Sequence, residues 1–152
     1  MPRQAWRALR EALIKLSSRR WHWLLLALWL AGMLFPTALP GKSSPAYRAA
    51  FNAVFHPQWV HVVMHLVLFA GLSLLLVILF RLPLGWRTAG LLLGAAALVG
   101  VGQEILQAFS QGFLYIWGAA FDLGVDLLGA GLGYLLMWWR SLIRGARKSG
   151  LS

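Results

Sequence analysis

Long apolar stretches alternate with short polar or basic segments along this chain. A helix of about 20 apolar residues crosses the hydrocarbon of a bilayer. Four stretches reach or approach that length: residues 21–39, 60–80, 88–109 and 122–139. The pattern predicts an all-α membrane protein with four transmembrane helices. Because no internal repeat and no polar globular segment interrupts it, we expect residues 1–152 to form a single membrane domain.

The segments that flank these stretches predict short interfacial elements. In the basic segment 1–20, one helical face gathers the apolar side chains Trp6, Leu9, Leu13 and Leu16. A basic helix with such a face is typical of the membrane surface. Residues 45–57 also carry apolar side chains on one side, so we expect a second short interfacial helix there. Residues 140–152 are predicted to form a basic tail.

The first stretch has a second interpretation. A basic start, an apolar centre and small residues near Ala38 follow the order of a signal peptide. Two tryptophans at its start and two prolines at its end favour a membrane span instead: Trp21, Trp23, Pro36 and Pro40.

Composition supports the membrane assignment. Hydrophobic residues make up 60% of the chain and charged residues 12%, whereas soluble domains average about 25% charged residues. The chain also contains nine tryptophans, a residue that favours the membrane–water interface. The absence of cysteine excludes disulfides, thiolate metal sites and thiol nucleophiles.

The basic residues predict the topology. The net charge of +10 comes from fourteen Lys and Arg residues against four Asp and Glu. With both termini in the cytoplasm, twelve of the fourteen lie on the cytoplasmic side, and only Lys42 and Arg48 lie outside. This strong positive-inside bias predicts cytoplasmic N and C termini. Attraction to the anionic cytoplasmic leaflet then accounts for the charge, and no nucleic acid partner is expected.

Six polar residues converge in this topology. The outer ends of the second, third and fourth spans carry, in pairs, His61 and His65, Glu104 and Gln107, and Asp122 and Asp126. The members of each pair are three or four positions apart, so they share one face of their helix. Charged residues inside a bilayer are costly and usually face a protein interior or a cavity. We therefore expect all six to line a ligand-binding pocket at the level of the outer leaflet.

Small residues continue these polar faces toward the membrane centre. Gly129 and Gly133 follow the aspartates on the fourth helix, and Gly90, Gly94 and Ala97 lie below the glutamate on the third. Small residues at such spacing let membrane helices approach closely. The sequence therefore predicts a tight helix contact that opens into the polar pocket.

Three interpretations of the pocket stay open. The first is a buried hydrogen-bond network that sets helix register. The second is a divalent-cation site, because a histidine pair at i, i+4 together with carboxylates can ligate zinc; the candidate ligands are His61, His65, Glu104, Asp122 and Asp126. The third is a catalytic, substrate-binding or proton-handling site. No Lys or Arg lies in the outer halves of these helices. Histidinium, shared protons or a bound cation must therefore balance the carboxylates.

The same residues resemble the VanZ-like family of small membrane proteins. That family shows a helical His, then Glu-x-x-Gln near the end of a later helix, then an Asp followed by Asn and Gly. Here the corresponding residues stand in that order, within about residues 61–139: His65, Glu104, Gln107, Asp122, Asp126 and Gly129. The resemblance implies a small multi-pass protein of the bacterial inner membrane.

Three positions depart from the family pattern. The family often has Asp where this chain has His61, and it usually has Asn where this chain has Asp126. Relative to the family, this chain loses an acidic group at the position of His61 and gains one at the position of Asp126. This exchange of charge within the predicted pocket is consistent with contact between the two positions. The family commonly has an Arg near the place of Phe113, and its loss argues against an anion-binding role.

Three functional hypotheses follow. The leading one is a non-enzymatic VanZ-like inner-membrane protein whose outer pocket binds an envelope component, a lipid headgroup or a cation. The alternative is an accessory subunit of a larger membrane complex, respiratory or photosynthetic, in which other membrane subunits are its partners and the polar cluster is architectural. The third is a membrane-embedded metal-dependent hydrolase, for which the sequence identifies no substrate.

Overall fold

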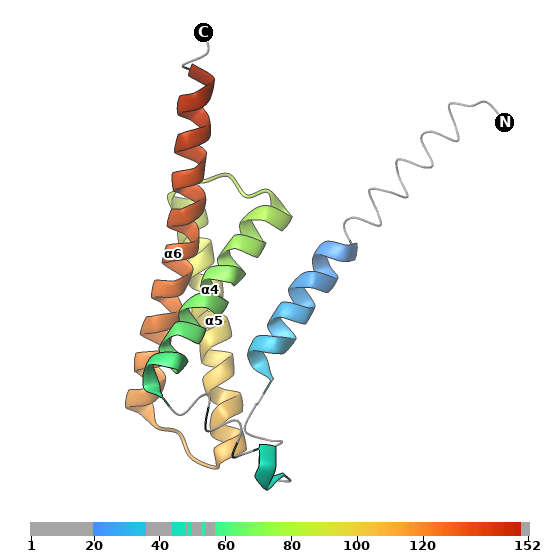
Figure 1. Ribbon diagram of the computed structural model, residues 1–152, viewed down its shortest axis with the longest axis vertical. Coiled ribbons are helices and arrows are strands. Elements are labelled where there is room, and N and C mark those ends of the chain that lie inside the picture. Colours follow the sequence, from blue (N-terminus) through green and yellow to red (C-terminus); the bar gives the residue numbers. More distant parts are fainter. Residues whose placement is uncertain (1–19, 36–43, 48, 50–52, 54–56, 150–152) are drawn as a thin grey trace, which may run out of the picture.

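The protein is all-helical over the residues described by the computed structural model, which are 20–35, 44–47, 49, 53 and 57–149. Three long helices dominate this part of the chain: α4 (Gln58–Phe80), α5 (Trp86–Gln111) and α6 (Ile116–Ser149) (Figure 1). Each contains a segment long and apolar enough to cross a membrane. Large hydrophobic side chains remain exposed along all three, as expected for helices that face lipid.

The first predicted span is helical over residues 20–34. This helix packs against α4, where the Trp29 indole N–H donates to the Leu68 carbonyl oxygen at 3.2 Å. The Trp29 ring also covers Gly71, where any side chain would collide with it. Residues 36–39 of the predicted span, the basic segment 1–19 and most of the predicted interfacial helix 45–57 lie outside the described residues.

The ends of α4 and α5 have local causes. Arg81 ends α4 in the left-handed conformation, with φ at 50°, and its N–H donates to the Val77 carbonyl oxygen. Gly112 ends α5 in the same region, with φ at 84°, and its N–H donates to the Ala108 carbonyl oxygen at 2.8 Å. Glycine is the residue best suited to this conformation. The chain therefore turns sharply into α6.

The last helix is longer than the hydrophobic pattern predicts. We expected a span over residues 122–139 followed by a basic tail, but α6 begins at Ile116 and continues to Ser149. The length of the apolar stretch indicates only how much of the helix lipid can surround, not where the helix ends. Six of the ten residues 140–149 are Arg, Lys, Leu or Ala, which are good helix formers, so the helix continues into the basic segment.

The closest helix contact joins α4 and α6. A Cβ atom at Gly129 would lie 2.7 Å from the Leu66 carbonyl oxygen, and one at Gly133 would lie 2.5 Å from the Ala70 carbonyl oxygen. These two glycines therefore let the helix backbones touch, as predicted for the fourth helix. The expectation for the third helix is wrong at its two glycines, because a Cβ at Gly90 or Gly94 would meet nothing within 4 Å.

A small core lies between these helices. Its most buried side chains come from four helices and include Leu26, Phe69, Leu72, Ala96 and Ala130. The helix over residues 20–34 contributes to this cluster together with α4, α5 and α6. Phe69 of α4 and Ala130 of α6 each lie four positions after a predicted site residue, His65 and Asp126, so the core fixes the register of the two helices next to the site.

Candidate metal and ligand pocket

Two histidine–aspartate pairs join α4 to α6. His65 Nδ1 lies 2.7 Å from Asp126 Oδ1, and both residues are almost completely buried, at 4% and 1% exposure. One turn nearer the start of both helices, His61 Nε2 lies 3.2 Å from Asp122 Oδ2. This second pair is more open, with 39% of the His61 side chain exposed. The predicted i, i+4 faces therefore meet each other, and each histidine has its own carboxylate.

The register of the pairs follows from the fold. α4 and α6 run in the same direction, each with its first residues at the lower end of the view in Figure 1. Both pairs are separated by the same number of positions along the chain, which is 61. Matched spacing on two helices of the same direction lets both hydrogen bonds form at once.

Gly100 on α5, which was not among the predicted site residues, completes the environment of the buried pair. A Cβ at Gly100 would lie 2.6 Å from Asp126 Oδ2 and 3.2 Å from Leu123 Cδ1. The bare backbone of α5 therefore backs the carboxylate on the side away from His65. Gly100 carries no polar group, so only its place among the other glycines of α5 marked it.

Glu104 and Gln107 lie beside Asp122 in a small cavity of about 140 Å³. Its other walls come from the turn between α5 and α6 and from the first residues of α6: Phe113, Leu114, Tyr115, Gly118 and Ala119. The turn residues Phe113, Leu114 and Tyr115 therefore close one side of this cavity. All six predicted site residues gather at one end of the helix bundle.

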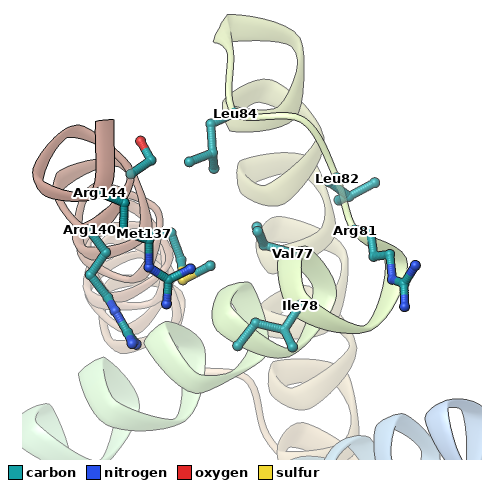
Figure 2. Close-up of a pocket in the computed structure, with 9 residues that line it drawn as sticks. Val77, Ile78, Arg81, Leu82, Leu84, Met137, Arg140 and Arg144 are labelled. Atoms are coloured by element: carbon teal, nitrogen blue, oxygen red, sulfur yellow. The ribbon is translucent and has the colours of Figure 1, made fainter. Parts of the chain in front are cut away.

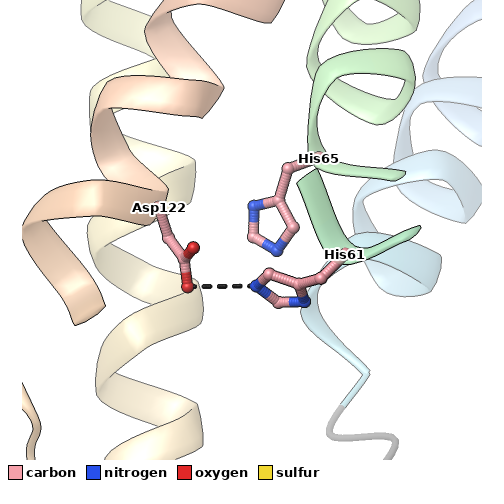
Figure 3. A group of neighbouring side chains, drawn as sticks. All are labelled: His61, His65 and Asp122. Atoms are coloured by element: carbon pink, nitrogen blue, oxygen red, sulfur yellow. Dashed lines mark hydrogen bonds and ion pairs between the residues drawn. The ribbon is translucent and has the colours of Figure 1, made fainter. Parts of the chain in front are cut away.

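Three of these residues are placed to hold a metal ion. One ligand atom from each of His61, His65 and Asp122 lies within 4.8 Å of the other two. Figure 3 shows the His61 and His65 rings next to each other, with the Asp122 carboxylate facing His61; the ring centroids are 4.3 Å apart. Two imidazoles and a carboxylate form a common zinc donor set, and such sites leave a position open for water or substrate.

Asp126 has the role of an orienting residue in this arrangement. Its hydrogen bond occupies Nδ1 of His65, which leaves Nε2 to face the metal position. Metal-binding histidines usually donate their other ring N–H to such a carboxylate, which fixes the tautomer and the ring orientation. In a metal-bound site, Asp126 would therefore orient the buried ligand His65.

Three other polar residues do not join this group among the described contacts. His22 lies on the helix over residues 20–34, whereas His56 falls outside the described residues. The buried Oε1 atom of Gln103 on α5 accepts no hydrogen bond from the described residues.

Comparison with models of known protein families, with curated proteins and with solved structures found no match.

Proposed function

We propose that this protein is a multi-pass membrane protein whose polar pocket binds a divalent cation. The observation that carries the proposal is the gathering of His61, His65 and Asp122, with one ligand atom of each within 4.8 Å of the others. Asp126 orients His65 from behind, and Glu104 adds a further carboxylate at the adjacent cavity. Zinc is the ion that this mixture of nitrogen and oxygen donors suits best.

The charges of the pocket favour a cation over an anionic headgroup. Its ionisable groups are three carboxylates and two imidazoles. The arginines of α6 lie toward its other end, and Arg140 is 18 positions after Asp122, or about 27 Å along a helix. A phosphate group would meet like charge, whereas a bound cation would offset it.

The volume of the adjacent cavity also favours a small ion over a large ligand. Its volume is about 140 Å³, whereas pockets for drug-sized ligands measure roughly 300–1,000 Å³. Neither histidine lines this cavity, so it adjoins the proposed metal position and shares Asp122 with it. It has room for a few water molecules beside the ion, since each water takes about 30 Å³, and it is too small for a large envelope component.

Metal analysis tests this proposal directly. Protein purified without chelator should carry stoichiometric zinc by elemental analysis, or should take it up in titration. The double variant His61→Ala with His65→Ala should lose that metal, whereas His22→Ala, a histidine on another helix, should keep it. Circular dichroism checks that each variant stays helical. Metal-free wild-type protein after zinc titration would contradict the proposal, as would equal metal content in the double variant.

We also propose, from the order of the motif residues, that the chain is a divergent VanZ-like protein of the bacterial inner membrane with its pocket outside. The support is the series His65, Glu104, Gln107, Asp122 and Gly129 and the gathering of its polar members at one end of the bundle. A variant that restores the residues of the family pattern tests whether the chain is related to that family.

The variant for that test combines His61→Asp with Asp126→Asn, which exchanges charge without changing the total number of acidic residues. A VanZ-like scaffold should accept the exchange and yield folded membrane protein in wild-type amounts. Aggregation of the double variant, under conditions where wild-type protein stays monodisperse, would contradict the kinship.

The structure also favours one alternative enough to test it. Three protein ligands would leave a fourth position of a bound zinc ion open, and the ion would supply an activated water for hydrolysis there. Zinc-dependent cleavage of ester or phosphoester probes, lost in the double histidine variant, would indicate a hydrolase.

Purification in mild detergent tests the accessory-subunit hypothesis, because a stoichiometric membrane complex would support it.

A further inference from the structure

A second cavity lies at the end of the bundle opposite the polar pocket. It has a volume of about 700 Å³ and is formed by the end of α4, the connection to α5 and the basic part of α6 (Figure 2). One wall is apolar and consists of Val77, Ile78, Leu82 and Leu84. We call this cavity the arginine groove, after the residues on its other walls.

The opposite wall of the arginine groove is basic. Arg140 and Arg144 come from α6 and also line the groove. They are four positions apart, so they share one face of the helix. Figure 2 shows both extending from α6 beside Met137, with Arg81 on the far rim. A guanidinium group binds phosphate through paired N–H donors, and two neighbouring ones can hold a single phosphate.

No carboxylate balances this charge in the part of the chain that the structure describes. The described acids are Glu104, Asp122 and Asp126, all at the polar-pocket end. The two ion pairs among the described residues both use histidine and leave the arginines to other partners. Among the described residues, the arginines of the groove therefore have no carboxylate partner, and their charge favours binding of an anion.

Its position relative to the bilayer indicates which anion. Trp138 and Trp139 directly precede Arg140 and are exposed, and tryptophan marks the membrane interface. The groove thus has arginines at headgroup depth and an apolar wall on the end of a membrane-crossing helix. Its volume falls within the range of about 300–1,000 Å³ typical of small-molecule pockets.

We propose that the arginine groove binds an anionic phospholipid. The lipid phosphate lies against Arg140 and Arg144, and the upper part of an acyl chain lies along Val77, Ile78 and Leu82. Basic pockets between membrane helices bind anionic headgroups in this way. The apolar wall is the reason to choose a lipid over free phosphate, because a phosphate ion would leave that wall uncovered.

Thermal unfolding in detergent with added lipid tests the proposal. Phosphatidylglycerol should raise the unfolding temperature of wild-type protein more than phosphatidylcholine with the same chains. The difference between the two lipids should disappear in the double variant Arg140→Gln with Arg144→Gln. Arg87→Gln is the control: it removes one positive charge from an exposed arginine outside the groove, as each substitution of the double variant does inside it, and it should keep the difference.

Four results would overturn the proposal. The first three are an equal response of wild-type protein to both lipids, an unchanged lipid preference in the double variant, and an equal loss of preference in Arg87→Gln. Inorganic phosphate that reproduces the whole effect of phosphatidylglycerol would also overturn it, because the apolar wall would then contribute nothing. If the double variant does not fold, Arg144→Gln alone should at least halve the difference between the two lipids.

Discussion

The contact between α4 and α6 has no room for a methyl group at Gly129. A Cβ atom there would lie 2.7 Å from the Leu66 carbonyl oxygen and 3.0 Å from the Leu66 Cα. Both are backbone atoms, so neither can rotate away and the two helices must separate. Overpacking of this kind typically costs about 1–3 kcal/mol. We expect Gly129→Ala to lower the free energy of unfolding by that amount relative to a matched control.

Gly131→Ala is the matched control. It lies on the same helix, and a Cβ there would meet nothing within 4 Å. Both substitutions replace Gly by Ala inside a helix, and this exchange by itself stabilises the helix by at most about 1 kcal/mol in either variant. The difference between the two variants therefore isolates the collision with Leu66.

Denaturant unfolding in micelles, followed by circular dichroism, measures both variants. Separation of the helices should also stretch the 2.7 Å hydrogen bond between His65 and Asp126, so Gly129→Ala should weaken zinc binding while Gly131→Ala should not. Equal stability of the two variants would refute the close contact. Lower stability of Gly129→Ala with unchanged zinc binding would refute the link from the contact to the pocket.

Three further predictions test the pocket and the topology. Asp126→Ala should cost about 1.5–3 kcal/mol of stability, because it removes a buried charge-assisted hydrogen bond, whereas Asp122→Ala in the more open pair should cost less than about 1 kcal/mol; equal losses in micelle unfolding would contradict this ranking. Gly100→Ala places a Cβ 2.6 Å from the Asp126 carboxylate and should weaken zinc binding roughly 10–100-fold, the usual effect of disturbing an orienting partner; an unchanged affinity in chelator competition would show that Asp126 does not orient the ligand. In this cysteine-free chain, Leu114→Cys should react with an impermeant maleimide in intact spheroplasts and Gly85→Cys only after permeabilisation, and the reverse result would invert the topology.

Much of the helical architecture is readable from the sequence because lipid imposes a simple length requirement. The stretch 60–80 corresponds to α4 within two residues, since Pro57 stands just before the helix and Arg81 ends it. The predicted span 122–139 lies inside α6, but hydropathy says nothing about polar flanks that continue as helix to Ser149. The i, i+4 spacing of the histidines and of the aspartates likewise requires only helical periodicity.

The sequence by itself therefore determined that the chain forms apolar helices and that His61, His65, Asp122 and Asp126 share helix faces. Only the tertiary structure decided which groups meet. Glycine permits close approach but does not cause it, so Gly129 packs against α4 whereas a Cβ at Gly94 would meet nothing. The pairing of each histidine with its own aspartate depends on the direction and offset of α4 and α6. These are set by packing between segments far apart in the sequence, which no local pattern records.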